Sequence, residues 1–301
     1  MSVWPVLRAE GLLVWKSRWI AILTLLLVAW AVWGGPFGTY RTAVRGMEQI
    51  EALRAAYQSQ SAAFVLDDAI TADLQSAVAL LHPAMGPNYL LAILAVLGTM
   101  VSPIWGAQMA GSEFRHRTAK VRAAHAGWTQ VVAAKLCWLL LLSLALALLF
   151  AAMGAVSGQV TWRAAQEAIP LAGDVTPPPL KAPLASQVLV TALGMFFFGL
   201  IGLLAALVTR SALAGALAGL ALPYVEAFVI GTPAWGWLLP RIAYGNLMVD
   251  QFVYLPGGMV GEPLALVPAP SSWVSWAVVA AWTVLAGWAA LRVSRTQQIL
   301  S

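Results

Sequence analysis

Few residues in this 301-residue chain have side chains that could perform catalysis or bind a metal. The three histidines, His82, His116 and His125, are not arranged in a metal-binding motif, and the single cysteine, Cys137, lies in an apolar run where we expect inert packing. The chain contains no His-Glu-x-x-His, no Gly-x-Ser-x-Gly and no Gly-x-x-x-x-Gly-Lys-Ser/Thr motif. We therefore expect no catalytic residue, no metal site and no cofactor in this chain.

The most informative polar stretch covers residues 111 to 130. It is basic, compatible with a short helix and bounded by glycines at Gly111 and Gly127. A charged connector of this kind is suited to docking against another protein. The alternative is a plain basic loop whose only role is to orient the chain in a membrane.

The composition indicates that the rest of the chain is embedded in lipid. Hydrophobic residues make up 61% of the chain and charged residues only 10%, whereas a soluble domain carries roughly 25% charged residues. This amount of polar surface is too small to cover a water-soluble globule. We therefore expect the remaining apolar surface to face lipid. The net charge of +5 comes from short basic stretches between apolar runs, which argues against nucleic acid as a partner.

Apolar runs of about 20 residues predict the membrane spans. The sequence predicts one all-α, polytopic membrane domain over residues 1–301 with six transmembrane helices. We expect these spans at residues 19–35, 88–110, 128–157, 184–208, 212–231 and 272–292, with a tight turn at Thr209-Arg210-Ser211 between the fourth and fifth.

Lysine and arginine predict the orientation. Eleven of the 17 lie on the side that holds both termini and the 111–127 segment, and six lie on the other side. The positive-inside rule therefore places the N- and C-termini in the cytoplasm.

The segments between the spans carry patterns of their own. Trp4, Leu7, Gly11, Val14 and Trp15 predict an N-terminal interfacial helix, although an ordinary basic lead-in is the alternative. In the 36–87 loop, two apolar stripes predict an external helical hairpin: Met47, Ile50, Leu53 and Tyr57, then Ile70, Leu74, Val78 and Leu81. We expect the loop at 158–183 to be partly extended, because it holds three consecutive prolines.

The outer end of the fifth span and the aromatic loop after it are candidates for a substrate path or gate. Glu226 is the one carboxylate inside a predicted span, where a charge is costly and often functional. The other candidates are Tyr224, Trp235, Trp237 and Tyr244, and we expect short helices in this loop. The alternative is a hydrogen-bonded structural carboxylate beside plain aromatic anchors at the membrane surface.

The connector resembles one known family. Its order of small residue, x, Glu, aromatic residue, Arg, x, x and Thr, followed by a basic stretch and then Ala134-Lys135, is similar to that of the permeases of type-2 ABC exporters. Glu113, Thr118 and Lys135 match the family pattern, whereas Arg117 stands where many members have Gly. The layout of spans and loops is similar as well.

The resemblance implies that residues 111–127 form a cytoplasmic coupling helix. In the family this helix sits in a cleft of a separate ATPase subunit, which binds the ATP and Mg²⁺. The residues implied in ATPase coupling are Glu113, Phe114, Arg115, Arg117, Thr118 and Lys120. Closure of the ATPases would move the second and third spans, with Pro103 and Pro223 as expected kinks and Gly154, Gly158, Gly215 and Gly219 as expected close contacts.

The resemblance also implies the setting of the chain. We expect a permease subunit in a bacterial inner membrane, in contact with membrane lipids and paired with a second copy or a paralogue. An extracytoplasmic partner could bind the external hairpin. Two other classes stay open: a membrane scaffold or assembly factor without transport activity, and an intramembrane enzyme, which the missing catalytic motifs disfavour.

Overall fold

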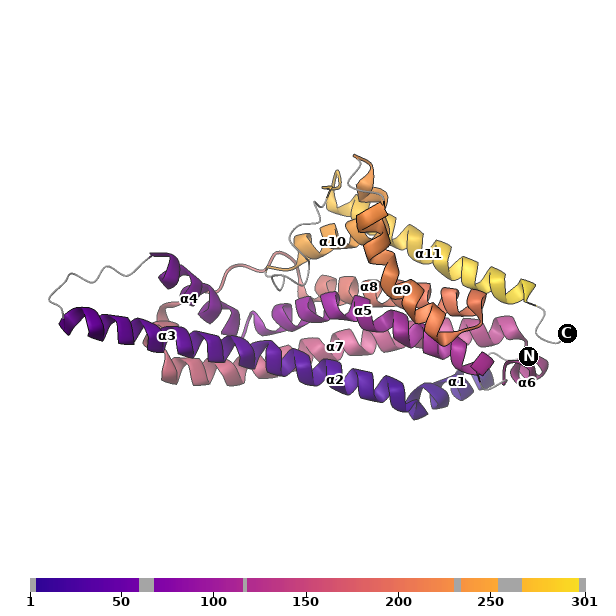
Figure 1. The fold of residues 1–301 in the computed structure, drawn as a ribbon, viewed down its shortest axis with the longest axis horizontal. Helices are drawn as coiled ribbons and strands as arrows, with labels where there is room; N and C mark the ends of the chain where they lie inside the picture. The colour runs from indigo at the N-terminus through magenta and orange to yellow at the C-terminus, as the bar shows by residue number, and fades with distance from the viewer. Residues whose placement is uncertain (1–3, 60–67, 116–117, 230–233, 254–266, 298–301) are drawn as a thin grey trace.

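The computed structural model describes residues 4–59, 68–115, 118–229, 234–253 and 267–297. These residues form helices joined by turns and short extended segments, and no strand occurs among them. The predicted all-α class is therefore confirmed. The molecule is elongated, with α1 (Trp4–Lys16), α6 (Ala119–Ala126) and the end of α11 (Ser272–Thr296) at one end (Figure 1).

Within the residues that the structure describes, five helical segments are long and apolar enough to cross a membrane. This fits a multi-pass membrane protein. The segments belong to α2 (Arg18–Gly34) with its continuation into α3 (Pro36–Ser59), and to α5 (Gly86–Arg115), α7 (Trp128–Ala168), α8 (Leu184–Thr209) and α11.

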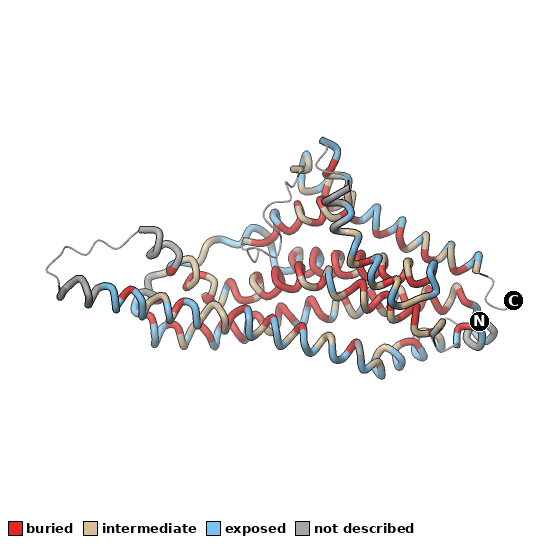
Figure 2. The backbone as a smooth tube through the Cα atoms, viewed as in Figure 1, coloured by how far each residue is buried: buried red, intermediate tan, exposed pale blue. Residues whose placement is uncertain are grey.

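The α5–α8 pair is the centre of the bundle. The most apolar stretches of α5 and α8 are 72% and 67% buried, compared with 28% for those of α2 and α11. Leucines and tryptophans on the outer helices are exposed instead, among them Leu25 and Trp288 (Figure 2). Such apolar outer surfaces are what lipid contact requires.

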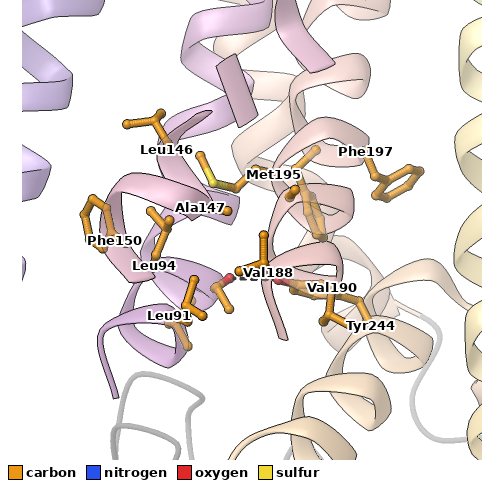
Figure 3. Packing of buried hydrophobic residues seen from close by; sticks show 14 of the residues in the cluster. Leu91, Leu94, Leu146, Ala147, Phe150, Val188, Val190, Met195, Phe197 and Tyr244 are labelled. Carbon is orange, nitrogen blue, oxygen red and sulfur yellow. Dashed lines mark hydrogen bonds between the residues drawn. The ribbon is translucent and has the colours of Figure 1, made fainter. Parts of the chain in front are cut away.

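Small residues let the central helices approach closely. A side chain on Gly106 of α5 would collide with the backbone of Gly199 on α8, and one on Gly202 of α8 would collide with the backbone of Pro103. Larger side chains from α5, α7, α8 and α10 fill the remaining space, including Leu94, Phe150, Met195 and Tyr244 (Figure 3).

The four glycines expected to make close contacts do so. Gly154 of α7 packs on the backbone of Gly86, with Gly158 beside it, while Gly215 and Gly219 of α9 (Ala212–Val229) pack on Gly202. Because an absent side chain lets two backbones meet, these contacts confirm the small-residue prediction.

The turn between α8 and α9 is as tight as expected. Arg210 alone separates α8 from Ser211 and adopts a left-handed conformation with φ 55°, and the Ser211 hydroxyl accepts a hydrogen bond from the Ala214 amide at 3.3 Å. This arrangement caps α9. The apolar part of α9, Ala212–Leu222, is shorter than the five candidate spans, so the predicted span at 212–231 is not among them.

The first and third spans continue well past their predicted ends. The helical pattern bridges Gly34-Gly35-Pro36 because Gly35 donates to Ala31 and Thr39 donates to Gly35, both at 2.9 Å, and a proline is tolerated at the first position of α3. The 41-residue α7 reaches Ala168 rather than residue 157. At 1.5 Å per residue it is about 60 Å long, which is twice the thickness of a bilayer core.

The protruding parts of these helices form a helical extension with α4 (Asp68–Leu81) and the 3₁₀ helix η1 (Pro170–Asp174). We call α3, α4, the part of α7 after Gly158 and η1 the extension. Ile50, Leu74, Val78 and Ile169 are buried in its core, which confirms the helical prediction for this loop. Leu53 was predicted in the apolar stripe but is 44% exposed. The side chains of Tyr57 and Ile70 lie outside the described residues.

The chain between α9 and α11 contains the short helices that the sequence predicts. They are η2 (Gly236–Leu238) and α10 (Pro240–Gln251), and α10 packs on α8 and α11. The segment at 175–183 is not helical, whereas residues 158–168 belong to α7. The sequence predicts a partly extended loop, and its non-helical part is this last stretch, with extended backbone at Val175 and a polyproline-like conformation at Pro183.

Candidate functional site

The connector, residues 111–127, joins α5 to α7. The sequence predicts one helix here, but the structure has two pieces: α5 continues to Arg115, and α6 begins at Ala119. The Thr118 amide donates to the Glu113 carbonyl at 3.0 Å, a bond over five residues that ends a helix. At the other end, Gly127 has φ +77°, which lets α7 begin directly after α6.

A buried ion cluster lies where the connector leaves α5. The Lys135 ammonium on α7 lies 2.7 Å from a Glu113 carboxylate oxygen and 2.8 Å from a Glu10 carboxylate oxygen on α1. The three side chains are at most 4% exposed. We call Glu10, Glu113 and Lys135 the triad.

The triad joins three helices from distant parts of the sequence. A buried charge without a partner is strongly destabilising, so the ion pairs with Lys135 help to keep both carboxylates stable in this position. The Glu113 carboxylate, which the resemblance places among the ATPase-coupling residues, is buried and paired with Lys135 within the chain.

A second set of contacts holds the other side of the connector. Phe114 packs edge-to-face on Trp128, with ring centroids 5.6 Å apart. The Trp128 indole N–H donates to the side-chain oxygen of Gln297 at 2.9 Å, and the Gln297 amide donates to the Leu207 carbonyl at 2.5 Å. These bonds tie the start of α7 to the ends of α8 and α11.

Helix α1 packs against α7 beside the triad. The Trp138 indole covers Gly11 so closely that any side chain there would collide with it, and its N–H donates to the Leu7 carbonyl at 2.7 Å. Trp4 and Trp15 are 72% and 87% exposed. The predicted apolar stripe is therefore split: Gly11 packs against Trp138 of α7 and Val14 is partly buried against the core, whereas the two tryptophans are exposed.

Other connector residues present an outward polar surface. Thr118, Lys120 and His125 are exposed. Arg117 lies outside the described residues, as does the side chain of Arg115, which is the last residue of α5. Of the six residues predicted to couple to an ATPase, Thr118 and Lys120 thus face outward, while Glu113 and Phe114 pack inward.

A cavity of about 450 Å³ lies between α1, the start of α2 and the end of α5. The triad forms one wall. The basic residues Lys16 and Arg18 form the rim of the cavity. The other lining residues are the apolar Leu13, Val14, Ile20 and Met109 and the polar Ser17, Gln108, Ser112 and Thr118.

Of the five predicted gate residues, the structure describes the side chains of Trp235, Trp237 and Tyr244. Trp235 is 52% exposed, whereas Tyr244 is buried and its hydroxyl donates to the Ala95 carbonyl at 3.3 Å. Burial raises the pKa of the Tyr244 phenol far above its usual range, so it stays a neutral donor. Trp237 is half-buried. The side chains of Tyr224 and Glu226 lie outside the described residues.

Sequence reasoning missed Glu10, Trp128, Trp138 and Gln297. Glu10 interrupts an apolar helix face, which was the available signal, since a carboxylate on such a face needs a cationic partner. Nothing in the sequence identifies that partner as Lys135, which lies 125 residues away. Within the described residues, no group of three or more His, Cys, Asp or Glu side chains is placed to hold a metal ion.

Comparisons of the chain with protein-family models, with curated proteins and with solved structures give no match.

Proposed function

We propose that this chain is the permease subunit of an ATP-driven transporter of the type-2 ABC exporter class. The observation that carries the proposal is the mounting of the connector: α6 exposes Lys120 and His125, and the helix ends on either side of it, in α5 and α7, are joined by the Glu113–Lys135 ion pair and the Phe114–Trp128 contact. A helix held in this way can transmit a displacement of a soluble ATPase subunit to α5 and α7. ATP and Mg²⁺ belong to the separate ATPase subunit.

The same proposal assigns a membrane topology. α9 is the sixth span, next to the five segments that qualify by length and composition. α1 is an interfacial helix, α6 a cytoplasmic coupling helix and the extension an external hairpin. Both termini are cytoplasmic, in a bacterial inner membrane, and a second permease copy or a paralogue completes the assembly.

The triad refines the role of the connector. Glu113 and Lys135 fix the ends of α5 and α7 to one another, so a force on α6 moves the two helices together. Glu10 adds α1 to this unit. We assign the direct motor contact to the exposed positions Thr118, Lys120 and His125, and an indirect positioning role to Glu113.

Site-specific photocrosslinking in native membranes tests this assignment. A crosslinking residue at position 120 should join the chain to a protein that carries a nucleotide-binding Gly-x-x-x-x-Gly-Lys-Ser/Thr loop, with a yield that changes when ATP is added. The matched control is position 48, because Glu48 is also exposed but lies in the extension. An ATPase adduct at both positions, or at neither, would contradict the proposal.

The scaffold alternative has one observation in its favour. The extension reaches well beyond the predicted spans and exposes Arg41, Arg45, Glu48 and Glu51, which suits a water-soluble partner. Crosslinks to such a partner from Glu48, together with no ATPase adduct from Lys120, would favour a scaffold over a permease.

A further inference from the structure

The cavity beside the triad has an unusual combination of walls. Lys16, Ser17 and Arg18 lie in sequence at the junction of α1 and α2, and all three line it. Gln108, Ser112 and the triad also line the cavity. The cavity thus combines basic residues with other polar and charged side chains.

The two cations on the rim are Lys16 and Arg18. Neither the Lys16 nor the Arg18 side chain makes an ion pair or a hydrogen bond with any residue that the structure describes. Lys135, the third cation at the cavity, is already engaged by two carboxylates. The rim therefore has positive charge available to an anion.

The backbone adds to this charge. Ser17 is the N-cap residue of the 17-residue helix α2, but its hydroxyl makes no capping bond, so the first amides of α2 are not capped by this side chain. A helix start carries partial positive charge that favours phosphate. At this cavity, the partial charge at the start of α2 adds to the positive charge of Lys16 and Arg18.

The surroundings of the cavity are apolar. Leu13 and Ile20 line it, and Leu12 and Trp15 next to it are 53% and 87% exposed. A free phosphate ion would gain no favourable contact from these apolar side chains. A molecule with a phosphate at one end and acyl chains at the other would fit both parts.

We propose that this cavity is a binding site for the headgroup of an anionic phospholipid. The phosphate lies between Lys16, Arg18 and the start of α2, and the acyl chains run along the outer surface by Leu13 and Trp15. The bound lipid bridges the α1–α2 junction to the end of α5, next to the triad. The site requires only that the chain lies in a membrane, and it does not depend on an ATPase partner.

Native mass spectrometry of the purified full chain with added phosphatidylglycerol tests the site. Replacing Lys16 and Arg18 together with Gln should weaken the tightest lipid adduct by about tenfold or more, because each cation near a lipid surface contributes about 1 kcal/mol. The matched control is Arg8→Gln, since Arg8 is an exposed cation on α1 that does not line the cavity. It should leave the adduct unchanged.

Wild-type protein supplies a second test that does not depend on folding of the variants. Phosphatidylglycerol should raise the melting temperature in detergent, whereas diacylglycerol, which has the same chains without the phosphate, should not. Inorganic phosphate at the same concentration should also have no effect. Equal stabilisation by diacylglycerol, stabilisation by inorganic phosphate alone, or equal loss of the adduct with Arg8→Gln would each overturn the proposal.

Discussion

The two ends of the molecule are held together by different interactions. At the connector end, buried charges and side-chain hydrogen bonds join α1, α5, α7, α8 and α11. In the extension the buried cluster is apolar, and next to the extension α7 meets the start of α5 through Gly154 and Gly86. Polar contacts are directional and lose most of their strength when one partner moves, whereas apolar contacts tolerate sliding. The connector end is therefore built for one defined geometry.

The largest effect is expected from the removal of Lys135. Lys135→Met leaves two carboxylates buried together without their shared cation, so the free energy of unfolding should fall by about 3–5 kcal/mol. Denaturant unfolding in detergent measures this loss. The control Lys120→Met changes an exposed lysine and should have little effect. Equal stability of the two variants would mean that the triad does not hold the connector end.

A smaller loss is expected where α7 meets α5. In Gly154→Ala the new methyl group would collide with the backbone of Gly86, which is destabilising by about 1–3 kcal/mol. The control is Gly287→Ala on α11, where nothing lies within 4 Å of the new methyl group. That variant should be neutral or slightly more stable, because alanine favours a helix. Thermal unfolding of both variants under the same conditions tests the close contact.

A single hydrogen bond at the connector should contribute less. Trp128→Phe keeps an aromatic ring against Phe114 but removes the N–H that Gln297 accepts, so stability should fall by about 1 kcal/mol. Trp288→Phe, at a site that is 63% exposed, serves as the control and should cause no loss. If the two variants unfold at the same denaturant concentration, the bond to Gln297 does not stabilise the connector end.

The smallest effect is expected on the outer surface of the extension. Leu53 is 44% exposed, so Leu53→Ser should change the free energy of unfolding by no more than about 0.5 kcal/mol. Ile50→Ser, three residues away, replaces a buried side chain and should be much more destabilising. A large loss in the Leu53 variant would show that this side chain is covered by a partner in the protein as purified.

Much of the helical architecture could be predicted from the sequence because it depends on local patterns. Apolar run lengths gave the long helices, and Thr209-Arg210-Ser211 gave the tight turn. Helix ends were harder to place. The sequence Gly34-Gly35-Pro36 favours a helix end, yet glycine and a first-turn proline are both compatible with continued helical hydrogen bonds.

The candidate site was predicted only in part, for a different reason. The connector was recognisable from its charge, but the inward direction of Glu113 depends on Lys135 and Glu10, which the fold brings together from three helices. The residues 113 and 120 are both charged, and sequence alone cannot tell that one is buried and the other exposed. Long-range pairing of this kind is decided by packing, not by local pattern.

The unbroken course of α7 has a consequence for communication between the two ends. One helix carries Lys135 in the ion cluster near its start and Ala165 in the extension core near its end, without a proline between them. A continuous α-helix resists stretching, so an axial shift imposed at its start is transmitted toward its far end. In the proposed topology, a rearrangement at the connector would therefore also move the extension.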